Sequence, residues 1–515
     1  MDTPYAWTQR LGIIDLGSNS ARLVVVQYTP GQSYKVTYEY SRRVRLAEGM
    51  ATGDDRLEPA AVGRAVETLA MFRDFCRAHG IQRLIPVATA ATRDAANQAD
   101  FLRQVRAATG LRLRVLTGRE ESYYGALGVI NGLGLRAGVV MDVGGGSAQV
   151  SRVRGGQFQR GQATPLGAVR LTEAFLPGER VGSAEYKRLA RYLDEQFAAL
   201  DWLALRPGEQ FVGLGGTLRT LARIDRDERD YPLRLLNGYA LSAERLDALI
   251  AQLRALPVRE RGRQIPGLPP DRADVSLAGA MVVAAALRRA GADQLVVSGQ
   301  GIREGLFFEN FLPKRARANP AIADLRRFSV LNLSRTYGYQ NAHANQVAQL
   351  AVALFDQLQR RHGYGQPERE GLWAAAQLND IGSAVNYQDH HKHSAYLILS
   401  AGLPGYSHRE TALIALLCVY HRKGKADLKT YQAVLEKGDP QRVRRLGAVL
   451  RLAEALDSSR TQDVAAVTVA ARRDVVRLTV KGRPGHDVRW EIGEAQRNAD
   501  LFEDAFNCRL EVAAG

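Results

Sequence analysis

The sequence has no uninterrupted apolar run of about 18 residues, the length that a membrane-spanning helix needs. It has only three cysteines in 515 residues, and Cys76, Cys418 and Cys508 are widely separated. This excludes a disulfide framework and a zinc site made of cysteines. The start of the chain also lacks a basic stretch followed by an apolar core and a small-residue cleavage site. We therefore expect a cytoplasmic protein without a membrane span.

The usual signatures of nucleic-acid binding are missing too. The sequence has no zinc-finger spacing, no aromatic RNA-binding signature and no Gly-rich loop ending in Lys-Ser or Lys-Thr. Acidic residues are comparatively few, because 54 Asp and Glu stand against 70 Lys and Arg, a formal net charge of +16. A basic protein favours polyanionic partners such as polyphosphate or nucleotides. Without the signatures, we expect no nucleic-acid partner.

One motif occurs twice, as IIDLGSNSARLVVV from Ile13 and as VMDVGGGSAQVSRV from Val140. In each copy an apolar strand ends in Asp and turns through Gly and small polar residues. Consecutive backbone N–H groups in such a turn form a nest for phosphate oxygens, and the strand-end Asp can hold a hydrated Mg²⁺. A third Gly-rich turn, GLGGTLRTLA, precedes an expected helix and adds another anion site. The candidate phosphate-binding residues are Gly17, Ser18, Asn19, Ser20, Gly144, Gly145, Gly146, Ser147, Gly215, Gly216 and Thr217, and the candidate metal ligands are Asp15 and Asp142.

The patterns around the repeat predict an α/β fold. Short apolar runs at 11–15, 22–28 and 34–40 predict strands, and a helical pattern follows over 58–79. The same order restarts at Ala137, so we expect two similar lobes that face each other across a cleft. We expect lobe I over residues 1–132 and lobe II over 133–312.

The composition changes after the basic, Pro-bearing stretch FLPKRARANP. Val347, Leu350, Ala351, Leu354, Phe355 and Leu358 follow helical spacing. We expect an all-α domain over 313–460 and a small α+β module over 461–515. In the module, VAAVTVA, DVVRLTV, VRWEI and CRLEV predict strands, and 494–506 predicts a helix.

Eight motifs in fixed order carry a family resemblance. They are DLGSNS, SRRVRLAEG, ATAATRDAAN, TGREESYYGALGV, MDVGGGSAQV, GLGGTLRTLA, PDRADV and SGQGIREGL. Together they resemble the exopolyphosphatase and guanosine pentaphosphate phosphohydrolase family of the actin-like ATPase superfamily, over Leu11 to about Leu306 and more weakly to the end. The resemblance implies two actin-like (ribonuclease H-like) lobes, followed by the HD-type helical domain of the long bacterial members.

The resemblance also implies a reaction and its residues. The family hydrolyses a terminal phosphoanhydride with water as the nucleophile, and Glu121 in GREESYY takes the place of its catalytic glutamate. A carboxylate there can deprotonate the water and is a third candidate ligand of Mg²⁺ or Mn²⁺. Neighbouring helix residues point in different directions, so we expect Glu120 to face away. Arg93 in ATRDA matches the family pattern and suits bidentate phosphate contact, with Arg43 and Arg272 as further candidates. A monovalent cation and a homodimer are further expectations from the resemblance.

The helical block departs from the HD pattern. NAHANQ, AQLNDIG, DHHKHSAYLI, VYHRKG and RLAEALDSSR resemble an HD-type domain, whose metal site would need His before Asp in the second motif. This chain has Asn379 before Asp380. Because an amide oxygen is a weak substitute for imidazole, we expect His391, His393 and His421 to bond between helices or to line a basic channel for polyanions.

We therefore predict an exopolyphosphatase that releases orthophosphate from inorganic polyphosphate, processively, because an extended basic helical domain offers sites for many phosphates of one chain. The alternative is a guanosine pentaphosphate 5′-phosphohydrolase, which converts pppGpp to ppGpp with the same Glu121 chemistry. Two further hypotheses are an actin-like, ATP-dependent kinase and a non-enzymatic nucleotide or alarmone sensor. A pure sensor has no need of a water-activating base such as Glu121.

Overall fold

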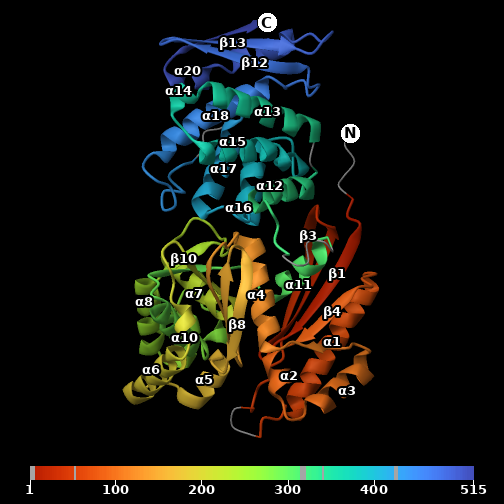
Figure 1. Cartoon of the computed structure of the whole chain (residues 1–515), viewed down its shortest axis with the longest axis vertical. Coiled ribbons are helices and arrows are strands. Elements are labelled where there is room, and N and C mark those ends of the chain that lie inside the picture. The colour runs from red at the N-terminus through yellow and green to blue at the C-terminus, as the bar shows by residue number, and fades with distance from the viewer. Residues whose placement is uncertain (1–5, 51–53, 314–319, 339–340, 423–426) are drawn as a thin grey trace. The chain divides into compact units, whose positions relative to one another are not determined.

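The computed structural model of the chain describes residues 6–50, 54–313, 320–338, 341–422 and 427–515. The chain divides into two compact units (Figure 1). The first comprises residues 7–231 and 236–325, and the second comprises residues 326–515 with the short segment 232–235.

Lobe I of the first unit is built on a five-stranded sheet with the order β3-β2-β1-β4-β5. The first three strands are antiparallel neighbours, and β4 and β5 continue the sheet parallel to β1. The middle of β1 is buried on both faces, which explains its continuous apolar run Ile13–Ile14. The elements are β1 (Gln9–Leu16), β2 (Ser20–Thr29), β3 (Ser33–Arg43), α1 (Pro59–Ala78), β4 (Leu84–Ala88), α2 (Ala90–Asp94), α3 (Gln98–Thr109) and β5 (Arg114–Val115).

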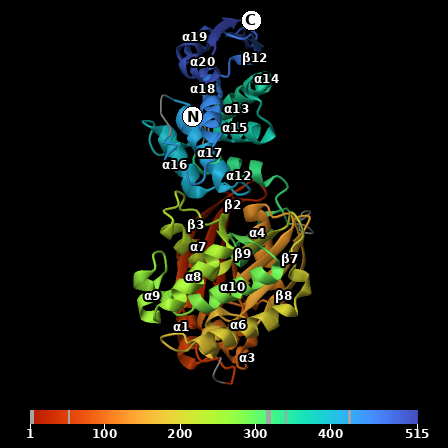
Figure 2. The ribbon, with the colours of Figure 1, turned by 90° about the vertical axis from the view of Figure 1, so that its left-hand side faces the viewer.

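Lobe II repeats this order in a six-stranded sheet, β8-β7-β6-β9-β11, with β10 added antiparallel at the edge. Helices α6, α8 and α10 lie together over the sheet (Figure 2). The predicted α/β fold of two similar lobes is confirmed. The strands are β6 (Gly138–Val143), β7 (Ala148–Arg154), β8 (Gln157–Thr164), β9 (Gln210–Leu214), β10 (Tyr239–Ser242) and β11 (Gln294–Val297). The helices are α5 (Ala168–Phe175), α6 (Ser183–Ala198), η1 (Asp201–Leu203), α7 (Gly215–Glu228), α8 (Ala243–Ala255), α9 (Val258–Gln264), η2 (Pro270–Arg272) and α10 (Ser276–Ala290).

Two helices connect the lobes by crossing between them. α4 (Gly118–Leu133) follows the last strand of lobe I but packs on β6, β7 and β8 of lobe II, and α11 (Ile302–Phe311) follows lobe II but packs on β1 and β2 (Figure 1). The two helices touch closely, since a Cβ on Gly305 would collide with the Tyr124 carbonyl oxygen. The catalytic candidate Glu121 is therefore carried by a helix that is anchored on lobe II.

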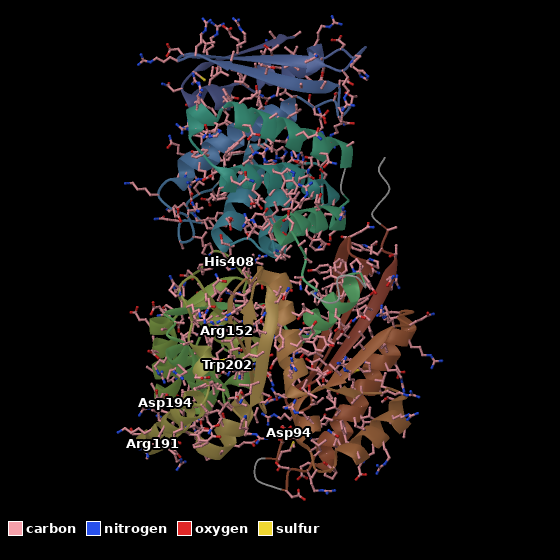
Figure 3. All side chains as sticks on the ribbon, in the orientation of Figure 1. Asp94, Arg152, Arg191, Asp194, Trp202 and His408 are labelled. Carbon is pink, nitrogen blue, oxygen red and sulfur yellow. The ribbon has the colours of Figure 1, made fainter. Side chains whose placement is uncertain are left out.

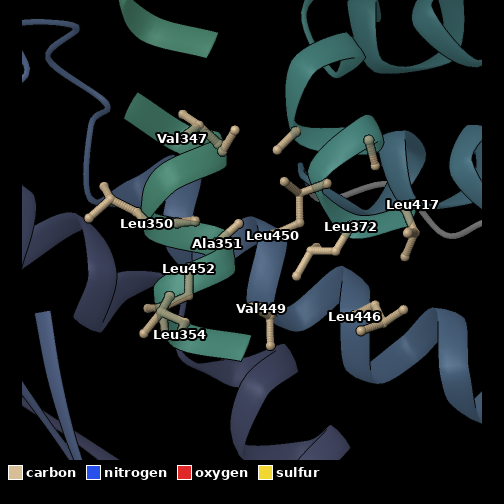
Figure 4. Close-up of a cluster of buried hydrophobic side chains, with 14 of the residues drawn as sticks. Val347, Leu350, Ala351, Leu354, Leu372, Leu417, Leu446, Val449, Leu450 and Leu452 are labelled. Carbon is tan, nitrogen blue, oxygen red and sulfur yellow. The ribbon is translucent and has the colours of Figure 1, made fainter. Parts of the chain in front are cut away.

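The second unit is a helical bundle with a small sheet. Its helices are α12 (Leu325–Thr336), α13 (Asn341–Gln357), α14 (Gln359–His362), α15 (Gln366–Leu378), η4 (Ile381–Ala384), α16 (His390–Ala401), α17 (His408–Tyr420) and α18 (Asp439–Ala455). The apolar stripe expected from Val347 to Leu354 lies on α13 and packs against α15 and α18 (Figure 4).

The tail forms a three-stranded sheet, β12 (Val464–Ala471), β13 (Val475–Gly482) and β14 (Arg509–Ala514), with α19 (Arg489–Arg497) and α20 (Asp500–Phe506). VRWEI does not form the expected strand, because it enters α19, where Glu491 and Ala495 are buried at helical spacing. The expected helix over 494–506 is two helices that are interrupted at 498–499. Val464, Leu478 and Phe502 of the tail belong to the same buried cluster as the helices. The tail therefore shares one core with the bundle.

Candidate active site

The two copies of the repeated motif form the same structure. Asp15 pairs across the hairpin with Arg22, and Asp142 pairs in the same register with Gln149. The turn after each Asp closes in the same way, because Gly17 N–H donates to the Ser20 carbonyl at 3.1 Å and Gly144 N–H donates to the Ser147 carbonyl at 3.0 Å. The sequence repeat is therefore also a repeat of hydrogen bonds.

The turns of the two lobes face each other at contact distance. A Cβ on Gly146 would lie 2.9 Å from Ser18 Oγ, and one on Gly145 would lie 3.4 Å from Ser18 Cβ. The third Gly-rich turn closes the remaining side, since a Cβ on Gly215 would collide with Asp142 Oδ1. Gly215 has a φ of +93°, a conformation that glycine adopts most readily. Backbone replaces side chains where the three turns meet, which leaves room for an anion.

Between these turns lies a cavity of about 130 Å³. Its wall brings together all the predicted turn residues and carboxylates, together with one of the three predicted arginines, Arg272. These residues are Asp15, Gly17, Ser18, Asn19, Ser20, Glu121, Asp142, Gly144, Gly145, Gly146, Ser147, Gly215, Gly216, Thr217 and Arg272. Thr217 Oγ1 donates to the Val143 carbonyl at 3.1 Å, which fixes the start of α7 beside the second turn.

The predicted arginines Arg43 and Arg93 do not line this cavity. Arg43 is exposed at the end of β3. Arg93 pairs with Glu121 through Nη1 and with Asp94 through Nε at 3.0 Å. Asp94 lies at the foot of lobe I, on the side that faces lobe II (Figure 3). Arg93 is thus placed to hold Glu121 in position.

Glu121 and Glu120 have different surroundings, as expected for neighbours on a helix. Glu121 is 3% exposed, and its second oxygen accepts a hydrogen bond from Gln149 Nε2 at 2.8 Å. Glu120 instead closes a capping box, because its carboxylate accepts from Thr117 N–H at 2.8 Å. The same sequence motif therefore supplies a helix cap and a buried carboxylate.

The carboxylates of the cavity have raised pKa values. Burial raises the pKa of Glu121 to about 8, although Arg93 lowers it, and the nearby Asp142 and Asp15 raise it further. Burial also raises the pKa of Asp142 to about 6 and raises that of Asp15 above its usual range. One buried and two half-buried acids that repel one another create a strong demand for a cation.

Several functional candidates were missed by the sequence analysis. Arg22 lines the cavity and acts electrostatically on both aspartates. Arg219 and Arg303 are buried nearby and lower the pKa of Asp142 and Asp15, respectively. Arg22 and Gln149 occupy the same position of the repeat, seven residues after each Asp, so comparing the two copies column by column would have found them.

The donor set fits Mg²⁺. The candidate ligands are all carboxylate oxygens, the donors that a hard cation prefers. Within the described parts of the chain, the carboxylate oxygens of Asp15, Asp142 and Glu121 do not all lie within 4.8 Å of one another. Such an open arrangement suits Mg²⁺, which keeps several of its waters and binds through one or two carboxylates plus substrate phosphate.

The comparisons with known proteins agree with this geometry. Residues 24–314 match the family model of the Ppx/GppA phosphatases, and residues 325–488 match the model of their domain III. The chain belongs to the Ppx/GppA phosphatase family. It is therefore a hydrolase of the phosphatase class, and its helical unit contains the family's domain III.

Solved structures of Ppx/GppA proteins resemble this chain. The chain is 28% identical to the Aquifex aeolicus family member, with a TM-score of 0.51 over 58% of this chain and 96% of that chain. A second Aquifex aeolicus structure, of the PPX-GPPA enzyme, is 29% identical with a TM-score of 0.50 over 58% and 98% of the chains. An exopolyphosphatase from Cytophaga hutchinsonii shares the fold at 23% identity, with a TM-score of 0.54 over 59% and 98%. No helix in the described ranges has the length and apolar character to cross a lipid bilayer.

Proposed function

We propose that this Ppx/GppA phosphatase is a Mg²⁺-dependent exopolyphosphatase that releases orthophosphate from the end of inorganic polyphosphate. One observation carries the proposal. A single cavity of about 130 Å³ combines three backbone turns suited to phosphate oxygens with three carboxylates, of which Glu121 is buried and Asp15 and Asp142 are half-buried. This size suits one terminal phosphoryl group, while the rest of a chain would extend beyond it.

The chain's own residues bind and orient the terminal phosphate. The N–H groups of the turns after Asp15 and Asp142 suit its oxygens, and Arg22 and Arg272 add positive charge on the same wall. These contacts are fixed before substrate arrives, because each turn is closed by its own hydrogen bond. Preorganised donors of this kind stabilise the charge that develops in the transition state.

Glu121 acts as the general base. A water attacks the terminal phosphorus, Glu121 accepts its proton, and the bond from phosphorus to the bridging oxygen breaks. The products are orthophosphate and a polyphosphate shortened by one phosphate. Arg93 and Gln149 hold the Glu121 carboxylate from two sides, which fixes its direction toward the cavity.

Asp15, Asp142 and Glu121 would hold the metal, directly or through water. When bound there, Mg²⁺ neutralises the phosphate oxygens and polarises the bond that breaks. A cation also favours the ionised form of Glu121, which its burial opposes.

The polymer is preferred over a nucleotide because the chain carries a net charge of +16 and a long helical unit after its phosphatase lobes. Multiple basic sites favour a polyanion with many phosphates. The alternative substrate is guanosine pentaphosphate, because the cavity accommodates one terminal phosphate and leaves the remainder of the substrate unspecified.

The test measures phosphate release from long-chain polyphosphate and from guanosine pentaphosphate with Mg²⁺. We compare the native chain with Glu121→Gln and with Glu120→Gln, the neighbouring control, and size the remaining polymer on gels. Glu121→Gln is expected to lower the rate by about 10²- to 10⁴-fold. Glu120→Gln should keep the rate, because its carboxylate caps the helix.

Release from long polymer with few intermediate lengths would support processive exopolyphosphatase action. Cleavage of the nucleotide alone would replace the polymer with guanosine pentaphosphate. Full activity in Glu121→Gln would overturn the assigned base.

A further inference from the structure

A second group of ligand-type side chains lies in the helical unit. His390 begins α16, His421 follows the end of α17, and Asp380 lies between α15 and η4. Their ligand atoms all lie within 4.8 Å of one another. The phosphatase site of the lobes does not include them, since all three belong to the second unit.

Backbone carbonyls fix the protonation of both imidazoles. His390 Nδ1 lies 2.8 Å from the Tyr387 carbonyl oxygen, and His421 Nδ1 lies 2.6 Å from that of Cys418. A carbonyl only accepts hydrogen bonds, so each Nδ1 carries the proton and each Nε2 of a neutral ring carries a lone pair. Metal-binding histidines are typically oriented in this way by their second nitrogen.

The two lone pairs point at each other. His390 Nε2 and His421 Nε2 are 3.0 Å apart and both are buried, an arrangement that requires a shared proton or a cation between them. Asp380 Oδ1 lies 3.0 Å from His390 Nε2 and 3.7 Å from His421 Nε2. This oxygen is buried and accepts no hydrogen bond from the described residues. His390 Nε2 could donate to this oxygen only if its ring carried a second proton, and a metal ion bound by all three atoms meets the same demand.

The spacing agrees with a metal site. Ligands about 2.0–2.1 Å from a tetrahedral zinc lie roughly 3.3 Å from one another. The three observed separations, 3.0, 3.0 and 3.7 Å, lie on both sides of that value. Only small shifts would bring the three atoms onto one ion.

The acidic side chains of Asp457 and Glu454, which lie beside this cluster, already have a hydrogen-bond partner within the protein. His343 contacts two carboxylates, Asp457 through Nδ1 at 2.7 Å and Glu454 through Nε2 at 3.0 Å. With both nitrogens donating, His343 has no lone pair for a metal. Arg460 Nη2 occupies Asp380 Oδ2 at 2.5 Å. Oδ1 is therefore the Asp380 oxygen that is available to a metal ion.

A cavity of about 1010 Å³ lies beside this cluster within the helical unit. Asp380, His390 and His421 all lie on its wall. Besides the three ligands, the same wall carries more cations than carboxylates. The cations are Lys392, Arg422, Arg451, Arg460 and Arg497, and the carboxylates are Asp389, Glu454 and Glu494. Three protein ligands leave a coordination position for an outside ligand, and cationic walls favour an anion there.

We propose that His390, His421 and Asp380 bind one divalent transition-metal ion, of the Zn²⁺ type, whose open position takes a phosphate group from the basic cavity. Imidazole nitrogens select this class of metal over Mg²⁺, so the site is chemically distinct from the all-oxygen site of the lobes. The loss of His at position 379 leaves this ligand set intact, because Asn379 Nδ2 bonds to Glu454 at 2.7 Å on the other side of the cluster.

The experiment uses the full chain after treatment with a chelator. Zn²⁺ binding is measured by calorimetry in the Asp142→Asn background, which weakens metal binding in the lobes. We expect one equivalent per chain, and His390→Ala and His421→Ala should each weaken binding by about 100-fold or more. His393→Ala is the matched control, since His393 is half-buried on the same helix and lies outside the cluster. His343→Gln should also keep the equivalent of zinc.

Co²⁺ provides a second readout that needs no variant. Bound by two imidazoles in a four-coordinate site, Co²⁺ should give intense visible absorption, whereas an all-oxygen octahedral site gives weak absorption. This spectrum of the native chain tests the proposed metal site even if a histidine variant fails to fold. Adding inorganic phosphate should shift the spectrum as the open position fills.

The proposal is overturned by the absence of stoichiometric Zn²⁺ binding, by binding that survives in both histidine variants, or by a weak octahedral Co²⁺ spectrum. A spectrum that phosphate leaves unchanged overturns the anion part. None of these readouts depends on polyphosphate hydrolysis, so the proposed function stands or fails separately.

Discussion

The lobes and the helical unit both bury acidic side chains, but they compensate the charge in opposite ways. In the lobes, burial and mutual repulsion raise the pKa of Asp142 to about 6 and that of Glu121 to about 8. In the helical unit, burial raises the pKa of Glu454, but the hydrogen bond from His343 lowers it below its usual range. At Glu454 the helical unit supplies its own cation, His343, whereas the lobes leave charge for a ligand from outside to neutralise. Uncompensated buried charge is typical of functional sites.

Replacing one aspartate in each region should change Tm in opposite directions. Asp142→Asn should lower kcat/KM for phosphate release by about 10²-fold or more, because it removes a metal ligand. It should also raise Tm at pH 8. The raised pKa of Asp142 means that ionisation above about pH 6 opposes folding, and Asn avoids that cost. Calorimetry and phosphate release on the same samples check both effects.

Asp457→Asn is the counterpart in the helical unit. Asp457 bonds to His343 and to Gln462 N–H, so we expect a lower Tm and unchanged phosphate release. If Asp142→Asn lowers Tm at pH 8, or Asp457→Asn raises it, the contrast between the two regions is wrong.

The shape of the lobe cavity depends on glycine at position 215, where a larger residue would place a side chain. Gly215→Ala should lower kcat/KM by about 10²-fold, because its Cβ would collide with Asp142 Oδ1 and displace that carboxylate. Gly208→Ala is the matched control, since Gly208 also has a positive φ, +81°, but a Cβ there meets no atom within 4 Å. Both variants should lose stability through the positive φ, Gly215→Ala more because of the added collision, and only Gly215→Ala should lose activity. Equal losses of activity would mean that backbone strain, rather than the collision, is responsible.

The raised pKa of Glu121 predicts the pH profile. The base must be ionised, so kcat/KM should rise with pH up to about 8 at low Mg²⁺, far above the range of an ordinary glutamate. Increasing Mg²⁺ should move this acid limb to lower pH, because a cation favours the carboxylate. A limb near pH 4 that is independent of Mg²⁺ would contradict the assignment of Glu121.

Variants of Arg22 and Arg43 test whether substrate binding depends on an arginine that lines the cavity or on the net charge of the protein. Arg22→Gln should raise KM by about tenfold, equivalent to the loss of one charged hydrogen bond. Arg43→Gln removes the same charge from an exposed position outside the cavity and should change KM less. Equal effects would indicate that the arginines act only through the general positive field.

The smallest effect is expected at the start of α4. Thr117→Ala should lower the free energy of unfolding by about 1 kcal/mol, because it removes the Oγ1 acceptor of the capping box. Activity should be retained, since Glu121 is held by Arg93 and Gln149. Denaturant unfolding monitored together with phosphate release separates the two.

The sequence by itself determined the two lobes and the Gly-rich turns that line the cavity between them. Both depend on local signals, namely apolar strand periodicity and Gly-rich turns in a repeat, which fix backbone geometry over a few residues. The tail was predicted less well, because VRWEI contains β-favouring residues whose helical state is decided by burial of Glu491 and Ala495 against the sheet.

Only the tertiary structure decided which charged groups meet. Arg93 was predicted to contact phosphate and is paired with Glu121. Arg219 and Arg303 come from distant segments to Asp142 and Asp15, respectively. In the helical unit, the sequence directed attention to Asn379, whereas His390 and His421, from different helices, converge on Asp380. Spacing along the chain fixes the backbone locally, but contacts between charged side chains depend on how separate elements pack.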